Sequence, residues 1–202
     1  RVLLDMYLHA YESVEAYPDW DWHVTYIRKD ARFTALANLS FAQTFADDRR
    51  ASVVPFRAVE IDAQGRLELP AHDFAIDRAS PAEADRVAAA LEAFFPIPML
   101  SAYQLLPADF ELQAIGRVFR QHDLVRRRTL LLARRGGQTE LAALVDVVEP
   151  GVYLAGLLDA VHLIPLGEKA NAAVIPLMEA VRRFYRNRNV ERFVLFDEHQ
   201  HL

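Results

Sequence analysis

The stretch RTLLLARRGGQTELAALVDVV, residues 128–148, decides the fold. Residues 128–135 are short, apolar and typical of a strand, and Gly136-Gly137 tolerates the positive φ angles of a tight hairpin turn. Residues 138–148 return as a second strand, bounded by Glu149-Pro150-Gly151. The sequence therefore predicts a hairpin of two strands that pair outward from the two glycines.

Four further elements follow the hairpin. Residues 152–165 (VYLAGLLDAVHLIP) predict a third strand, and residues 167–172 predict a loop. Apolar residues at helical spacing predict a helix over 173–188, and residues 190–197 predict a closing strand. This order indicates an α/β core, and a site is expected where the third strand ends and the helix begins.

Composition excludes several classes of protein. The net charge of -5 argues against a general nucleic-acid binder. The chain has no cysteine, which excludes disulfides, thiolate zinc sites and a cysteine nucleophile. No apolar run reaches ~18 residues, so we expect no membrane span. The chain shows no secretory signal and opens on Arg1 rather than Met, so we expect a cytoplasmic part of a longer protein.

Upstream of the hairpin, the chain is expected to divide into two α/β units, residues 1–70 and residues 73–202. In the first unit, helical spacing predicts a helix over 31–45 with Asp30 as its N-cap. Residues 53–61 predict a strand of the same unit. The alternation of helices and strands makes both units α/β.

The segment SPAE, residues 80–83, is the clearest helix start in the chain. Ser80 and Glu83 form a capping box, and Pro81 occupies the first helical position. The helix should run to Phe95 and end before Pro96.

Residues 73–202 present a connected pattern of such elements. FAIDRASPAEADRVAAAL gives a strand, a polar turn and a helix, and a second helix begins at Pro107. VRRRTLLLARRGGQTELAALV gives a basic approach to a hairpin, and LLDAVHLIP ends at a proline before a loop and helix. AVRRFYRNRNVERFVLF carries a tyrosine near the helix end before another strand. This pattern resembles the GNAT superfamily of acyl-CoA-dependent N-acyltransferases.

The resemblance implies a mixed central sheet flanked by helices, with residues 1–70 as the remnant of a second GNAT-like module. It also implies that acetyl-CoA or another acyl-CoA binds after Pro165, with its pyrophosphate on backbone N–H groups at a helix N-terminus. The implied cofactor-binding residues are Leu163, Gly167, Lys169, Asn171, Ala172 and Ala173.

The loop departs from the family pattern, which is Arg or Gln, two residues, Gly, one residue, then Gly or Ala. Glu168, Asn171 and Ala173 occupy those positions, and only Ala173 fits. A carboxylate at Glu168 would repel a pyrophosphate, although Gly167 and Lys169 would partly compensate in a shifted loop. The alternative interpretation is an ordinary loop that caps a helix at Asn171.

An N-acyltransferase must deprotonate an amine and reprotonate a departing thiolate. By its position in the resemblance, Tyr185 would be the acid that protonates the thiolate. The alternative is an aromatic side chain packed beside Phe184.

For the base, Asp159 and Glu149 are the candidates, and His162 lies nearby. Strand alternation places Asp159 and His162 on opposite faces. The alternatives are that Asp159 pairs with an arginine of Arg126–Arg128, that His162 is a core histidine and that Glu149 is on the surface.

Two charged segments have further interpretations. Arg126–Arg128 would either steer an anionic ligand or form a solvated strand end. The tail Asp197, Glu198, His199 and His201 matches the spacing of no closed metal site, so we expect no metal.

Two functions follow. The first is an acyltransferase that moves an acyl group from an acyl-CoA thioester to the amine of an unknown acceptor. The second is a non-catalytic GNAT-like module that binds a partner or small effector within a larger regulatory protein. The loop Gly167–Ala173 discriminates them: amides that converge on an open cleft favour the enzyme, and side chains that fill it favour the binding module.

Overall fold

The computed structural model describes residues 30–32, 35–36, 38–40, 57–65, 68–94, 100, 105, 125–149 and 159–197. The chain divides into two compact units. One contains Arg1–Val54 and Ser101–Tyr103, and the other contains Pro55–Leu100 and Gln104–Leu202. In the first unit, the described residues 32, 35–36 and 38–40 are helical and lie within the helix predicted over 31–45.

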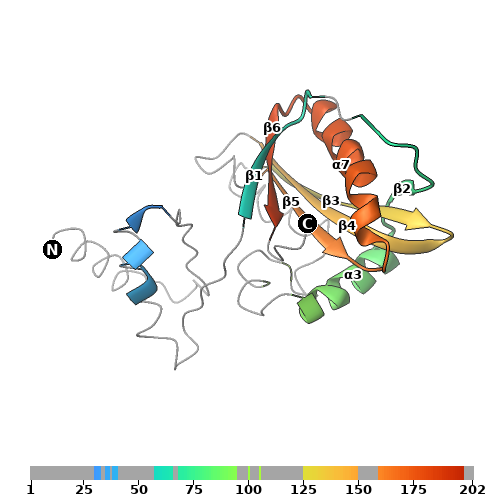
Figure 1. Ribbon diagram of the computed structural model, residues 1–202, viewed down its shortest axis with the longest axis horizontal. Coiled ribbons are helices and arrows are strands. Elements are labelled where there is room, and N and C mark those ends of the chain that lie inside the picture. Colours follow the sequence, from blue (N-terminus) through green and yellow to red (C-terminus); the bar gives the residue numbers. More distant parts are fainter. Residues whose placement is uncertain are drawn as a thin grey trace. The chain divides into compact units, whose positions relative to one another are not determined.

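A six-stranded mixed sheet is the centre of the second unit, with strand order β1-β6-β5-β4-β3-β2 (Figure 1). The strands are β1 (Arg57–Asp62), β2 (Ala75–Arg78), β3 (Val125–Arg135), β4 (Gln138–Glu149), β5 (Ala160–Pro165) and β6 (Arg192–Asp197). Only β5 and β6 pair in parallel, and the other neighbours are antiparallel. A parallel pair needs a crossover, which helix α7 (Ala170–Arg186) provides. The predicted α/β class and mixed sheet are therefore confirmed.

Strand β1 belongs to this sheet and not to a separate N-terminal unit. It pairs with β6 over six residues, from Arg57↔Asp197 to Asp62↔Arg192. The compact unit consequently begins at Pro55, upstream of the seam predicted between residues 70 and 73. The predicted and observed boundaries differ because a local sequence pattern does not reveal which distant strand a segment pairs with.

The β3–β4 hairpin forms at the predicted turn. Gly136 and Gly137 have φ angles of 58° and 84°, which only glycine adopts at little cost. The register changes by one between Ala133↔Leu141 and Arg134↔Thr139, so Glu140 is the extra residue of a β-bulge. A bulge redirects a side chain, which matters for the site described below.

Helix α7 covers one face of the sheet. Its buried residues recur at helical spacing, with Ala173, Leu177 and Val181 at 0% exposure. They join a core with alternate residues of β4, including Ala143 and Val145. Each fully buried Val or Leu side chain contributes about 1.5–3 kcal/mol.

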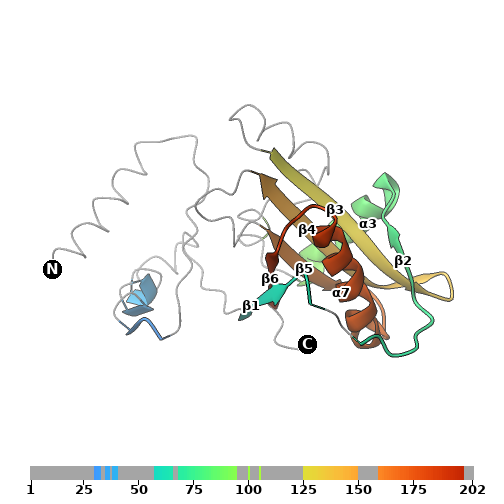
Figure 2. The ribbon, with the colours of Figure 1, turned by 90° about the horizontal axis from the view of Figure 1, so that it is seen from above.

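Helix α3 (Pro81–Phe94) lies on the other side of the sheet from α7 (Figures 1 and 2). Ala84, Val87, Ala88 and Leu91 form its buried stripe. The predicted capping box is confirmed: the Ser80 N–H and hydroxyl both donate to Glu83 Oε2, at 2.8 and 2.7 Å.

Several predicted boundaries differ. Helix α7 begins at Ala170 instead of Ala173, and its N-cap is Lys169 instead of Asn171. The third strand is described from Ala160 onward, while its predicted start lies outside the described residues, as does the helix predicted at Pro107. Among the described helices, none has the length and apolarity that a membrane crossing requires.

Candidate functional site

The loop between β5 and α7 is the predicted coenzyme site, and Glu140 holds it from the neighbouring strand. The Leu166 and Gly167 N–H groups donate to the Glu140 carbonyl oxygen, at 2.9 and 3.0 Å. The Lys169 N–H donates to Glu140 Oε2 at 2.8 Å. Both ends of Glu140, its main-chain carbonyl and its carboxylate, therefore bind the loop that precedes α7.

The bulge explains why Glu140 reaches this loop. As the extra residue of β4, Glu140 has no cross-strand partner in β3, and its side chain is free to turn towards the start of α7. Gly167 permits the close approach, because a Cβ there would collide with the Glu140 carboxylate. The carboxylate is buried, with Glu140 7% exposed.

The Glu140 carboxylate lies at the N-terminus of α7 and accepts a backbone N–H hydrogen bond there, as bound anions do at other helix N-termini. Lys169 is the N-cap of α7 and makes no side-chain cap hydrogen bond. The first N–H groups of a helix are unpaired within the helix and attract negative charge. Glu140 supplies that negative charge from within the chain, so one of the amides that would face a pyrophosphate is already engaged.

The predicted cofactor-binding residues divide between the core and the surface. Leu163 is 2% exposed and Ala173 is 0% exposed, so both side chains lie in the core. Gly167, Lys169, Asn171 and Ala172 are exposed, together with Glu168. The Ala172 and Ala173 N–H groups donate to the Lys169 carbonyl oxygen, at 3.1 and 3.3 Å, and are engaged within the helix.

Tyr185, the predicted acid, is completely buried. Its hydroxyl donates to the Asp146 carbonyl oxygen at 2.7 Å and lies 3.2 Å from the Ala160 carbonyl oxygen. Its ring stacks on Phe193, with 4.4 Å between centroids, and meets Phe184 edge-on. Burial raises the pKa of this phenol well above its ordinary value, and the negative charges of Asp146 and Asp159 add to the shift. The hydroxyl is thereby a poor proton donor to solvent.

The position of Tyr185 has a structural reason. The β4–β5 pairing ends at Val145↔Val161, so Asp146 and Ala160 are the next residues beyond the ladder. Their carbonyl oxygens converge on the Tyr185 hydroxyl, which satisfies buried acceptors that the strands no longer pair. The alternative interpretation of Tyr185, an aromatic packed beside Phe184, agrees with this geometry.

The candidate bases lie on or beside β4 and β5. Asp159 is partly exposed just before β5, and its carbonyl oxygen accepts the Val194 N–H at 2.9 Å. His162 is buried and stacks on Phe196, with 5.2 Å between centroids, as the core alternative proposed. Glu149 ends β4 opposite Val125, and its side chain lies outside the described part of the chain.

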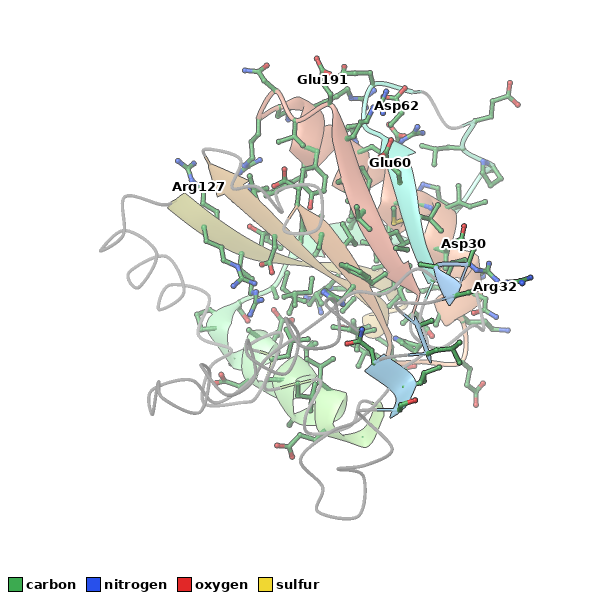
Figure 3. All side chains as sticks on the ribbon, turned by 90° about the vertical axis from the view of Figure 1, so that its left-hand side faces the viewer. Asp30, Arg32, Glu60, Asp62, Arg127 and Glu191 are labelled. Carbon is green, nitrogen blue, oxygen red and sulfur yellow. The ribbon has the colours of Figure 1, made fainter. Side chains whose placement is uncertain are left out.

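The three arginines of the predicted steering cluster divide between two faces. Arg127 is exposed (Figure 3), whereas Arg126 and Arg128 are buried. Arg128 donates to both carboxylate oxygens of Asp146, at 2.7 and 2.8 Å, and Arg126 donates to one of them at 2.8 Å. Strand alternation explains the division, because Arg126 and Arg128 share a face that Arg127 does not.

Asp146 therefore has an ion-pair role that the sequence interpretation missed. Burial alone would raise its pKa, but the Arg128 and Arg126 guanidinium groups overcome that effect and lower the pKa to about 2. A signal for this pair exists in the sequence: counting back from Gly136-Gly137 places Arg128 within one residue of Asp146 on the facing strand.

In the described residues, His, Asp and Glu form no group of three that could hold a metal ion. The tail 198–202 lies outside them. Comparisons of the chain with protein-family models, with curated proteins and with solved structures each found no match.

Proposed function

We propose that residues 73–202, with β1 added at the edge of the sheet, form a GNAT-like module that binds a partner or small effector and does not transfer acyl groups. The observation that carries this proposal is the Glu140 carboxylate on the Lys169 N–H at the start of α7. This is the place at which the resemblance expects a coenzyme A pyrophosphate.

The sheet order supports the fold half of the proposal. Antiparallel strands β2, β3, β4 and β5 run in sequence, and α7 then crosses to the parallel strand β6. The resemblance expects a hairpin, a strand that ends at a proline, a helix and another strand in this order. Fold alone does not establish an activity, so the function depends on the loop.

Electrostatics supports the non-catalytic half. A pyrophosphate that approached the Lys169 amide would meet a carboxylate at hydrogen-bonding distance from the same N–H group. Two negative charges about 4 Å apart repel by about 4 kcal/mol near a protein surface. Coenzyme A would have to displace Glu140, and the displaced carboxylate would then lose its charged hydrogen bond.

The acyltransferase remains the second candidate, and one specific observation favours it. The loop that follows β5 leads directly into the N-terminus of the crossover helix, which is the arrangement that the enzyme requires. In this alternative, Glu140 swings out when an acyl-CoA binds, and the partly exposed Asp159 deprotonates the amine acceptor. Tyr185 would need to leave two carbonyl oxygens before it could act as the acid.

Calorimetric titration of the full chain with coenzyme A, acetyl-CoA and a long-chain acyl-CoA tests the two candidates. The binding module predicts no heat of binding and no thermal shift, and no release of free coenzyme A in the presence of primary amines. Saturable binding with turnover by the unmodified chain would contradict the proposal and support the acyltransferase.

Two variants make the result specific to Glu140. Glu140→Ala frees the Lys169 N–H and is expected to gain binding of coenzyme A. Glu168→Ala is the matched control, because it removes an exposed carboxylate from the same loop and leaves Glu140 in place. The control should behave as the unmodified chain does.

A further inference from the structure

A cavity lies against α7 and the neighbouring strands β1 and β6. Its volume is about 230 Å³, and its wall is formed by Ile61, Val174, Ile175, Met178, Arg182 and Leu195. For comparison, an apolar cavity of about 150 Å³ is large enough to bind benzene. The cavity can therefore hold a small organic molecule.

The wall is assembled from α7 and the edge of the sheet. Val174, Met178 and Arg182 are four residues apart and share one stripe of the helix. Ile61 and Leu195 come from the paired strands β1 and β6. Ile175, at 45% exposure, marks the rim towards solvent. Apart from Arg182, every side chain of the wall is apolar.

Arg182 is the exception, and its hydrogen bonding is incomplete. The residue is 8% exposed. Its Nε and Nη2 donate to the Asp62 carbonyl oxygen, at 3.0 and 2.7 Å. Asp62 lies at the end of β1 (Figure 3). The turn at Gly65 lies against Nη2, where a Cβ would collide with it. Nη1 is buried and has no hydrogen-bond partner among the residues that the structure describes.

A buried, charged N–H donor without an acceptor is energetically unfavourable, because it has lost its hydrogen bonds to water and has gained none within the protein. Nε and Nη2 lie along one edge of the guanidinium plane, so the Nη1 edge faces away from the Asp62 carbonyl. An anionic oxygen on that edge would accept a hydrogen bond from Nη1 and so complete the hydrogen bonding of Arg182. The apolar wall would then surround whatever is attached to the anion.

We propose that this cavity binds a small amphiphile with a carboxylate head and an aliphatic tail. The carboxylate accepts a hydrogen bond from Arg182 Nη1, and the tail packs against Ile61, Val174 and Leu195. A fatty acid of medium chain length has this chemistry. Met178 also lines the cavity, and its unbranched, flexible side chain can adjust when a ligand enters.

This site is separate from the β5–α7 loop. The Arg182 side chain binds the end of β1, whereas Glu140 binds the residues that precede α7. The inference consequently holds whether or not the loop accepts coenzyme A.

Octanoate titrated into the full chain, with NMR detection of the methionine methyl groups, tests the proposal. Octanoate should shift the Met178 methyl signal saturably. Octanol and octylamine have the same tail with a neutral and a cationic head, and acetate has the head without the tail. We expect octanoate to bind about tenfold or more tightly than octanol and octylamine, because a hydrogen bond between charged groups discriminates by that much. Acetate should also bind about tenfold or more weakly, because it lacks the apolar tail that the cavity buries.

Two variants and a control separate binding from folding. Arg182→Gln removes the cationic head-group contact, and Ile175→Trp fills the cavity while it keeps the arginine. Both should weaken octanoate binding by about tenfold or more. Arg183→Gln removes the exposed neighbouring arginine and should leave the affinity unchanged. Circular dichroism checks that each variant folds. If Arg182→Gln does not fold, the octanoate affinity of Ile175→Trp shows whether the ligand binds in this cavity.

Equal affinity for octanoate and octanol would overturn the proposal, since it would remove the role of the charge. Unchanged octanoate affinity in the folded variants would overturn it as well. Binding that follows the carboxylate and is lost in Ile175→Trp supports it.

Discussion

Helices α3 and α7 both begin with an acidic side chain on unpaired backbone amides, but the acid comes from different distances. At α3, Glu83 accepts from Ser80 three residues away. At α7, Glu140 accepts from Lys169 across 29 residues of sequence. A local cap only starts a helix, whereas a distant cap also ties the helix to a strand and, in the function proposed above, fills the place where a ligand would bind. The α7 N-terminus is therefore the more informative of the two about function.

The largest effect on stability should come from Asp146, a buried carboxylate with two cationic partners. Its loss gives an upper limit against which the losses at the two helix caps can be compared. Asp146→Asn leaves Arg126 and Arg128 without their shared anion, so the free energy of unfolding should fall by about 3–5 kcal/mol. Urea denaturation measures it. Asp77→Asn is the control, because Asp77 is exposed and its 3.4 Å ion pair with Arg134 contributes below about 1 kcal/mol. Equal losses would show that burial does not govern the effect.

Acid should weaken the same ion pair. Folding lowers the pKa of Asp146 from 3.8 to about 2. Its stabilisation of about 2 kcal/mol is fully present above pH 3.8 and is lost as the pH falls through 2. Glu83 has a pKa of about 2, lowered first by its hydrogen bonds to Ser80, and acts in the same direction. Urea midpoints between pH 5 and pH 2 should fall less steeply in Asp146→Asn, and equal slopes would refute the assignment.

Glu140→Ala should lower the free energy of unfolding by about 2 kcal/mol, because removal of the buried carboxylate leaves the Lys169 N–H without its acceptor. Glu168→Ala removes an exposed carboxylate and should change the free energy of unfolding by less than about 0.5 kcal/mol. Chemical denaturation of both variants measures the difference. If the two losses were equal, the distant cap would contribute no more than a solvated loop carboxylate.

The smallest effect should come from the local cap. Ser80→Ala removes the hydroxyl that donates to Glu83, and helix caps of this kind contribute about 1 kcal/mol. Its effect on stability should therefore be smaller than that of Glu140→Ala, and it should leave coenzyme A binding as it is in the unmodified chain. A loss larger than that of Glu140→Ala would reverse the order of the two caps.

The sequence predicted the parts of the fold whose causes are local. The Gly136-Gly137 turn and the α3 capping box both depend on neighbouring residues, and both are confirmed. The placement of β1 depends on pairing with a strand 130 or more residues away, so periodicity in residues 53–61 could not assign it to a sheet.

The candidate site was less predictable, because it depends on a single register shift. Without the bulge, alternation would send Glu140 to the face opposite Leu141, and nothing in the local sequence marks the bulge. Tyr185 was assigned from its place in the family pattern. Its partners are two carbonyl oxygens from β4 and β5, which only the assembled sheet brings together.

The occupancy of the α7 N-terminus by Glu140 can be observed at the Lys169 amide. Its ¹H–¹⁵N signal should stay unchanged when coenzyme A is added to the full chain, and should shift saturably when coenzyme A is added to Glu140→Ala. A saturable shift of that signal in the unmodified chain would contradict the account, because it would place a ligand where the carboxylate of Glu140 lies.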